Sequence, residues 1–254
     1  MDRFGHFLID PPLNPALNMA ADWQLLKSTN KPTIRFYRWD QPVISIGYRQ
    51  QTDPPQAILE LAEEYPIVVR PTGGGYLYHH RDLSYSILLP ETHPLTDQSI
   101  LESYGVIRTI FGRSLQQLNL LDEQETGTGT APSDNCLESA AGHEPVKDGA
   151  KWMAASQLRH RGRLLQHGSL FWKDPDWPDE LASNEPSHLR DPTTDITLKQ
   201  VREKLTKAFA EEIVGENGLK LINRSKQDWD RLLSQVIQFE VADIGQLPTF
   251  DRFN

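Results

Sequence analysis

The pattern of apolar and polar residues along the chain predicts helices and strands in mixed order. Apolar residues repeat at three- and four-residue spacing across Ser99–Leu118, which predicts a helix there. Asn14 followed by Pro15 predicts the N-cap and first turn of an earlier helix, which continues to about Ser28. Runs rich in β-branched and aromatic residues predict strands at Thr33–Trp39, Pro42–Tyr48, Ile67–Arg70, Tyr76–His80, Leu83–Leu89, Lys151–Arg159 and Arg163–Trp172.

The short segments between these elements predict how they connect. Asp40-Gln41 predicts a hairpin between the first two strands, and Arg161-Gly162 predicts a tight turn between the last two. A short helix is expected after Asp53, with a buried side made of Ile58, Leu59, Leu61 and Ala62. The first helix is expected to present an apolar face made of Leu17, Ala20, Ala21 and Leu25, with Trp23 as a further candidate.

The second half of the chain changes character after Leu121. Residues 122–135 are rich in glycine, threonine and acidic residues and cannot bury an apolar face, which predicts a mobile loop. Helices are predicted at Leu198–Val214 and Ser225–Phe239, so that the part from about 196 to 254 is expected to be helical. Antiparallel hairpins and segregated helices favour an α+β fold, with a mixed, largely antiparallel sheet flanked by helices. We expect residues 1–254 to form one domain.

Composition narrows the function classes. The formal net charge of −9 argues against broad nucleic-acid binding, because a phosphate-binding surface needs an excess of Lys and Arg. No apolar run approaches the roughly 20 residues of a membrane helix, and the N-terminus does not resemble a signal peptide. The single cysteine, Cys136, has no internal disulfide partner, which fits a reducing cytoplasm. Cys136 is therefore either an inert small side chain or a reactive thiol, and its polar, glycine-rich surroundings favour a nucleophile.

A glycine cluster is the densest backbone signal. Gly73, Gly74 and Gly75 follow an apolar strand that ends at Arg70, with Thr72 between them. Consecutive glycines allow positive φ and a close approach of the main chain to a ligand. Their N–H groups could bind a phosphate, carboxylate or thioester oxygen, although a glycine-rich hairpin without a ligand is an equally good interpretation. The lysine pattern of phosphate loops and the GxGxxG pattern of dinucleotide sites are both absent.

Histidines and a lysine are the other candidates for chemistry. His79 and His80 are neighbours on a predicted strand, so at most one of them is expected to face a given pocket. Further ligands at metal-binding spacing are missing, and no metal site is predicted. Lys151 begins an apolar strand and could hold a carbonyl or adenylate oxygen, or instead extend its ammonium to water. His167 lies on the next strand, which could bring it near Lys151, and it could be a base or a structural histidine.

Several of these segments occur in an order that resembles the biotin/lipoate protein ligase and octanoyltransferase superfamily. The resemblance covers roughly residues 5 to 215, and the similar motifs are Asn18-Met19-Ala20-Ala21-Asp22, Pro42–Tyr48, Arg70–Gly75 continuing to His79 and Leu83–Ser86, Gly149-Ala150-Lys151 with Ala154–Gln157, and His167–Leu170. The resemblance implies substrate-binding roles for Arg70, Thr72, Gly73, Gly74, Gly75, His79, Ser156, His167 and Gly168. Because Cys136 lies fifteen residues before Lys151, the chain most resembles the cysteine-dependent octanoyltransferases.

The resemblance implies a reaction of lipoate biosynthesis and leaves a rival open. Octanoyl would move from acyl carrier protein onto Cys136, and then to a lysine of a lipoyl domain or of the glycine-cleavage H protein, with Lys151 assisting and no cofactor required. In the rival interpretation the chain is an ATP-dependent lipoate–protein ligase. ATP and Mg would then be needed, Lys151 would hold the lipoyl-adenylate, and Cys136 would be incidental. A third possibility is a member that binds an acyl carrier or lipoyl domain without turnover.

Overall fold

The computed structural model describes residues 4–80, 82–121, 146–147, 150–151, 153–171, 196–215 and 218–234. The helices in this part of the chain are α1 (Pro15–Ser28), α2 (Gln56–Leu61), the 3-10 helix η1 (Pro94–Thr96), α3 (Ile100–Gln116), α4 (Leu198–Phe209), the π-helical turn η4 (Ala210–Val214) and α5 (Lys226–Leu233). The strands are β1 (Gly5–Leu13), β2 (Thr33–Trp39), β3 (Val43–Gly47), β4 (Ile67–Arg70), β5 (Leu77–His79), β6 (Leu83–Leu89), β7 (Val146–Lys147), β8 (Ala150–Lys151), β9 (Met153–His160), β10 (Arg163–Leu170) and β11 (Leu219–Leu221).

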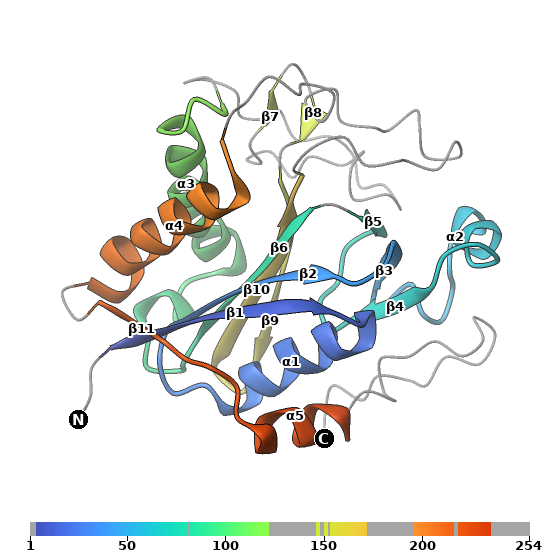
Figure 1. The fold of residues 1–254 in the computed structure, drawn as a ribbon, viewed down its shortest axis with the longest axis horizontal. Helices are drawn as coiled ribbons and strands as arrows, with labels where there is room; N and C mark the ends of the chain where they lie inside the picture. The colour runs from blue at the N-terminus through green and yellow to red at the C-terminus, as the bar shows by residue number, and fades with distance from the viewer. Residues whose placement is uncertain are drawn as a thin grey trace.

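A six-stranded mixed sheet with the order β11-β1-β2-β6-β10-β9 forms the centre of the described structure (Figure 1). The pairs β1–β11 and β1–β2 are parallel, whereas β2–β6, β6–β10 and β10–β9 are antiparallel. A second sheet has the order β4-β3-β5, and β7 and β8 form a short pair. This arrangement confirms the α+β prediction.

The central strands β2, β6 and β10 are buried on both faces of the large sheet. On one face, Ile34 and Phe36 of β2 pack in a cluster that includes apolar residues of α3 and α4. On the other face, Tyr37 and Trp39 pack with α1 and with Leu232 of α5. Successive side chains of a strand point to opposite faces, so β2 contributes to both layers. The small sheet and α2 have a separate apolar cluster.

Local capping signals explain where the helices begin. The Asn14 side chain accepts a hydrogen bond from the Ala16 amide at 2.9 Å, and Pro15 occupies the first turn of α1. The Ser99 hydroxyl and the Glu102 carboxylate form a capping box at the start of α3. Both helix starts agree with the sequence-based predictions.

Other predictions were wrong where long-range pairing decides the structure. The runs flanking Asp40-Gln41 are strands, but they do not form a hairpin, because β2 belongs to the large sheet and β3 to the small one. Strands β1 and β11 were missed, and β11 interrupts the C-terminal part that was expected to be helical. Leu59 is exposed rather than buried, whereas Ile58 and Leu61 are buried as expected. By contrast, the Arg161-Gly162 turn is confirmed, with φ values of 47° and 75°.

Helix α1 also differs from the expected one-sided amphipathic helix. Leu17 and Leu25 are only half-buried, while the polar residues Asn18 and Asp22 are completely buried. The helix is enclosed on almost every side, and its polar groups therefore need partners inside the protein.

No helix in the described ranges has the length and apolar character needed to cross a membrane.

Candidate active site

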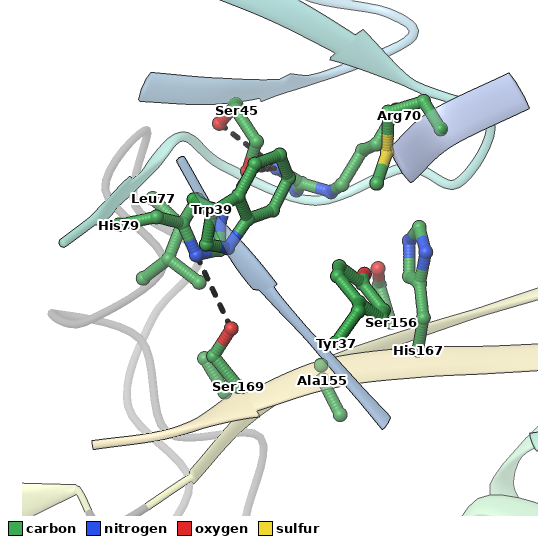
Figure 2. Close-up of a pocket in the computed structure, with 13 residues that line it drawn as sticks. Tyr37, Trp39, Ser45, Arg70, Leu77, His79, Ala155, Ser156, His167 and Ser169 are labelled. Carbon is green, nitrogen blue, oxygen red and sulfur yellow. Dashed lines mark hydrogen bonds between the residues drawn. The ribbon is translucent and has the colours of Figure 1, made fainter. Parts of the chain in front are cut away.

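A pocket lies between the large and small sheets (Figure 2). The empty space in and at the mouth of this pocket is about 350 Å³. The lining combines apolar side chains with a few polar ones, from α1 and from strands of both sheets: Met19, Tyr37, Trp39, Ser45, Arg70, Leu77, His79, Ala154, Ala155, Ser156, His167, Gly168 and Ser169. An apolar slot with convergent polar groups is the usual form of a ligand site.

The glycine turn after β4 forms one wall and is held by Arg70. The Arg70 guanidinium donates to the carbonyls of Gly73, at 2.9 Å, and of Gly75. It also donates to the carbonyl and hydroxyl of Ser45, at 3.1 and 3.3 Å. Only Gly74 has positive φ among the glycines of this turn, at 91°. The turn is thus fixed by its own arginine.

Two other glycines permit close packing around the pocket. A Cβ on Gly47 would lie 2.2 Å from the Gly74 carbonyl oxygen. A Cβ on Gly168 would lie 2.2 Å from the Ala154 carbonyl oxygen in the neighbouring strand. Since such contacts are sterically forbidden, glycine is required at Gly47, where β3 meets the glycine turn, and at Gly168, where β10 lies against β9.

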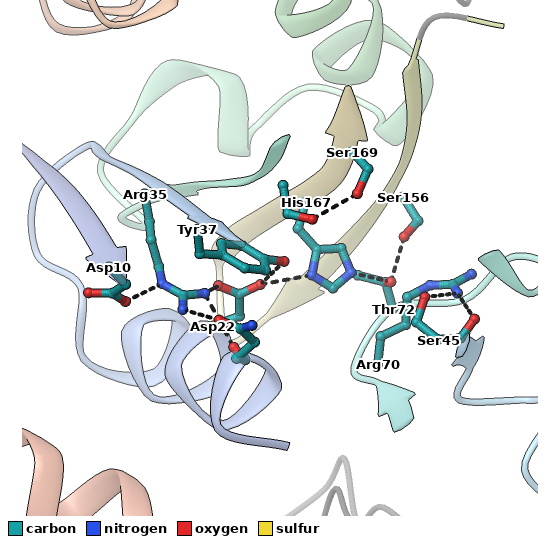
Figure 3. Close-up of polar contacts among 12 residues, drawn as sticks. Asp10, Asp22, Arg35, Tyr37, Ser45, Arg70, Thr72, Ser156, His167 and Ser169 are labelled. Atoms are coloured by element: carbon teal, nitrogen blue, oxygen red, sulfur yellow. Dashed lines mark hydrogen bonds and ion pairs between the residues drawn. The ribbon is translucent and has the colours of Figure 1, made fainter. Parts of the chain in front are cut away.

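The first polar network runs from the pocket into α1 (Figure 3). The hydroxyls of Ser156 and Thr72 are hydrogen-bonded, and Thr72 Oγ1 lies 2.7 Å from His167 Nε2. The Nδ1 atom of the same imidazole lies 3.0 Å from Asp22 Oδ2. Asp22 in turn accepts from Arg35 at 2.7 Å.

This network continues on the far side of Arg35 with two further charges. The Arg35 Nε atom donates to Asp10 at 2.7 Å, and Asp10 also accepts from Arg224 at 3.0 Å. The side chain of Arg35 is fully buried and those of Asp10 and Arg224 are nearly so. The two positive guanidinium groups and the two negative carboxylates give this buried cluster no net charge, so each buried ion has a partner of opposite charge.

The second polar network surrounds His79. Its Nε2 atom lies 2.8 Å from the Ser45 hydroxyl, and its Nδ1 atom lies 3.0 Å from Asp82 Oδ2. Ser84 donates to Asp82 at 2.9 Å and accepts from the Trp39 indole N–H at 2.9 Å. This network is built mainly from hydroxyls around one buried carboxylate.

Burial and neighbouring charges set the ionisation of these groups. Burial alone would raise the pKa of Asp22, but the Arg35 guanidinium and the hydrogen bond from His167 outweigh it, and the pKa is lowered. Burial lowers the pKa of His167, and Arg70 and His79 add to this, although Asp22 opposes it. At neutral pH the network therefore contains an ionised Asp22 and an uncharged His167.

The residues singled out from sequence fall into three groups. The side chains of Arg70, His79, Ser156 and His167, together with Gly168, line the pocket. Thr72 lies behind it and joins Ser156 to His167, and the glycine turn lies beside it. Cys136 and the loop at 122–135 lie outside the described residues, and only the backbone of Lys151 is described, in β8. The strand register places Ser156 rather than Lys151 opposite His167.

Several residues of the site were missed by the sequence reasoning. Asp22 and Arg35 are charged residues inside otherwise apolar segments, a signal that each needs a buried partner. Ser45 and Ser169 carry no such signal, because each contacts His79, which lies 34 and 90 positions away. Asp82 contacts His79 only three positions away, and a carboxylate between two buried strands is the signal that could have found it.

Comparison with known proteins places the chain in a family. The model of the lipoyl protein ligase A/B catalytic domain matches residues 14–210, which is most of the 254-residue chain. The chain belongs to this family.

Two related octanoyltransferases illustrate the similarity. Octanoyltransferase LipM of Oceanobacillus iheyensis is 36% identical over 170 residues, which cover 65% of this chain and 62% of the relative. The chain thus spans less than two thirds of that protein's length. Octanoyltransferase LipM of Anoxybacillus flavithermus is 32% identical over 254 residues, covering 91% of this chain and 87% of the relative.

Solved structures share the fold at lower identity. The structure of protein Ta0514 from T. acidophilum with bound lipoic acid has a TM-score of 0.67 and 20% identity, covering 91% of this chain and 94% of the other. Lipoate-protein ligase A bound with ATP has a TM-score of 0.65 and 19% identity, covering 92% and 94%. These likenesses show that this family member has the lipoate ligase fold.

Proposed function

We propose that this protein is an octanoyltransferase of lipoate biosynthesis. It takes octanoyl from octanoyl-acyl carrier protein and passes it to a lysine of a lipoyl domain or of a glycine-cleavage H protein, through a thioester on Cys136. The reaction needs no cofactor and takes place in the cytoplasm. Neither nucleic acid nor a membrane takes part.

The observation that carries the proposal is the pocket between the sheets. Met19, Trp39 and Leu77 give it an apolar wall. An octanoyl chain is apolar along its length and polar only at its carbonyl, and it matches a lining of this kind. The similarity to octanoyltransferases LipM favours this acyl group.

The chemistry of the proposal begins at Cys136. A free cysteine has a pKa of about 8.5, so its thiolate needs a nearby cation, and Lys151 is the candidate. The thiolate attacks the carrier thioester, and the carrier thiol leaves. Backbone N–H groups of the glycine turn and the Lys151 ammonium are proposed to stabilise the oxyanion that forms. The acceptor lysine then attacks the new thioester on Cys136.

Transfer without ATP tests this proposal against ligation. The protein is incubated with octanoyl-acyl carrier protein and an isolated lipoyl domain, and the mass of the lipoyl domain is followed. We expect octanoylation without ATP and none with Cys136→Ala. Transfer that requires ATP and Mg and survives Cys136→Ala would replace this proposal with the lipoate–protein ligase. Binding of both proteins without any turnover would leave only a binding function.

A lysine pair in the short sheet gives a second check. Lys151→Ala should slow transfer by at least ~10²-fold, since it removes a proposed oxyanion donor, with the fold unchanged by circular dichroism. Lys147→Ala is the matched control, because Lys147 lies on the paired strand β7. Near-normal transfer by Lys151→Ala would mean that the ammonium only extends to water.

A further inference from the structure

We propose that His167 is the general base of the transfer step and that it receives the proton of the acceptor amine through the hydroxyls of Ser156 and Thr72. The proposal rests on the octanoyltransferase function. It is carried by an unbroken hydrogen-bonded line from the pocket wall to a buried carboxylate, visible in Figure 3.

The direction of each hydrogen bond in this line follows from its end at Asp22. An ionised carboxylate only accepts hydrogen bonds, so His167 Nδ1, at 3.0 Å, must carry a proton. A neutral imidazole has one N–H, and Nε2 is then an acceptor. Thr72 therefore donates to Nε2 at 2.7 Å and accepts from Ser156. The Ser156 oxygen is left with a lone pair that can accept from a substrate N–H.

Exposure supports the same order. Thr72 is completely buried, whereas Ser156 is half-buried and lines the pocket. A substrate amine in the pocket can thus contact the Ser156 hydroxyl, while His167 Nε2 is covered by Thr72. The basic nitrogen is reached through the two hydroxyls.

The charges facing His167 come from four elements. Asp22 on α1 stabilises the imidazolium that forms, and the position of Asp22 is fixed by Arg35 on β2. Arg70 at the end of β4 and His79 on β5 oppose protonation. These opposing influences keep the His167 imidazole uncharged before the reaction. The Asp22 carboxylate then stabilises the imidazolium once the proton has arrived.

His79 is less suited to this task, although it also faces a carboxylate. Its Nε2 atom contacts the Ser45 hydroxyl, and the Arg70 guanidinium donates to that same hydroxyl at 3.3 Å. A proton accepted there would pass directly beside a fixed positive charge. Within the described residues, the Ser156 hydroxyl is hydrogen-bonded to Thr72 and not to a cation.

The proton and electron balance of the step is closed. The neutral amine nitrogen forms a C–N bond to the thioester carbonyl and becomes positively charged. It gives one proton to Ser156, Ser156 gives its proton to Thr72, and Thr72 gives its proton to His167. The C–S bond then breaks with its electron pair on sulfur, and the proton returns along the same hydroxyls to that thiolate. The products are an amide and the free thiol.

The test separates the two half-reactions in Thr72→Val, which keeps the shape of the side chain and removes the relay hydroxyl. Acylation by octanoyl-acyl carrier protein is measured first, by intact mass under single-turnover conditions. Transfer from the isolated acyl-enzyme to a lipoyl domain is measured second, over a range of pH. Thr72→Ser restores the hydroxyl, and Thr109→Val is the matched control, since that hydroxyl bonds only to its own helix at Gly105.

We expect Thr72→Val and Ser156→Ala to slow transfer by about 10²-fold or more and to leave acylation within a few-fold of normal. The deficit should shrink as the pH rises, because hydroxide can then take the proton of the positively charged adduct nitrogen in place of the relay. Thr72→Ser and Thr109→Val should transfer normally. Equal slowing of both half-reactions, or a deficit that does not change with pH, would overturn the relay alone. Failure of the unaltered protein to become acylated would overturn the octanoyltransferase function and the relay together.

Discussion

The two buried histidine–aspartate pairs of the pocket are similar in geometry and different in support. His167–Asp22 and His79–Asp82 both have a separation of 3.0 Å between Nδ1 and a carboxylate oxygen. Asp22 is held by Arg35, which belongs to a line of four buried charges. Asp82 is held by hydroxyls and backbone, including Ser84 at 2.9 Å.

The different surroundings of the two carboxylates suit the two histidine–aspartate pairs to different tasks. Charges fix Asp22 in its ionised state and in one position, which fixes the tautomer of His167 and leaves Nε2 as a base. Asp82 is held by the uncharged donors Ser84 and the His80 amide instead of a guanidinium, and that pair supports a polar wall. The segment at the end of β4 connects the two networks. Thr72 contacts His167 of the first network, and Arg70 contacts the Ser45 hydroxyl of the second.

The largest effect is expected from removing the central cation of the charged network. Arg35→Met leaves Asp10 and Asp22 buried without the guanidinium that both contact, and should lower the free energy of unfolding by about 3–5 kcal/mol. Arg113→Met removes an exposed pair with Glu212 and should cost about 0–1 kcal/mol. Urea denaturation measures both. A loss from Arg35→Met no larger than that from Arg113→Met would mean that the charges of the first network contribute little.

Acid should also destabilise the protein through these carboxylates. Burial alone would raise the pKa values of Asp10, Asp22 and Asp82, but all three are lowered in the folded state. The pKa of Asp10 is lowered by Arg35 and Arg224, and that of Asp22 by Arg35 and His167. The pKa of Asp82 is lowered by His79 and by nearby hydroxyls. Groups of this kind stabilise the fold above their unfolded pKa of about 3.9, and this stability is lost as the pH falls through the folded values. The lowered pKa of His167 adds an earlier loss, because the unfolded chain takes up a proton there near its ordinary pKa of about 6.5 while the folded protein does not. The free energy of unfolding should therefore begin to fall below about pH 6.5 and fall most steeply below about 4.

The variant Asp82→Asn shows which network causes this loss. Urea titrations at several pH values should give a shallower fall for Asp82→Asn, with most of the acid sensitivity retained by the charged network. If the free energy of unfolding of Asp82→Asn no longer changed with pH below about 4, the acid sensitivity would belong to the network around His79 and Asp82 instead.

A smaller effect is expected where the two networks meet. The Cβ in Gly47→Ala would push the Gly74 carbonyl, and with it the turn that carries Arg70 and Thr72, at a cost of about 1–3 kcal/mol and with weakened transfer. Gly105→Ala is the control, since nothing lies within 4 Å of its added Cβ. As it lies inside α3, that change should stabilise by about 0.5–1 kcal/mol. Normal stability and transfer in Gly47→Ala would show that the turn can shift without consequence.

The smallest effect is expected at the edge of the hydroxyl network. Trp39→Phe removes the indole donor to Ser84 and should cost about 0.5–1.5 kcal/mol, because Ser84 retains its bonds to Asp82 and Ser169. Thermal or urea unfolding measures the change. A loss as large as that of Arg35→Met would show that the two networks do not differ in strength.

The sequence predicted the features that depend on local signals. Asn14 with Pro15, the spacing in Ser99–Leu118 and the Arg161-Gly162 turn each act within a few residues, and the structure confirms all three. The glycine cluster and His167 were recognised as candidates, and both lie at the pocket or its wall.

The rest depends on pairs that are distant in sequence. Asp22 and His167 are 145 positions apart, and Asp10 and Arg224 are 214 apart. The predicted β2–β3 hairpin was wrong for the same reason, since β2 pairs with β1 and β6 and not with β3, the next strand along the chain. The spacing of apolar residues also predicted the wrong buried side for α1. Asn18 and Asp22 are polar and are nevertheless buried, because each hydrogen-bonds to Arg35.

The most direct test of the Cys136 thioester is to find the acyl group on that residue. The protein is mixed with octanoyl-acyl carrier protein without ATP or acceptor, quenched, digested and analysed by peptide mass spectrometry. We expect one octanoyl group per chain, in thioester linkage to Cys136, which is released when a lipoyl domain is added. An acyl group absent from Cys136, while the lipoyl domain still becomes octanoylated, would contradict this thioester.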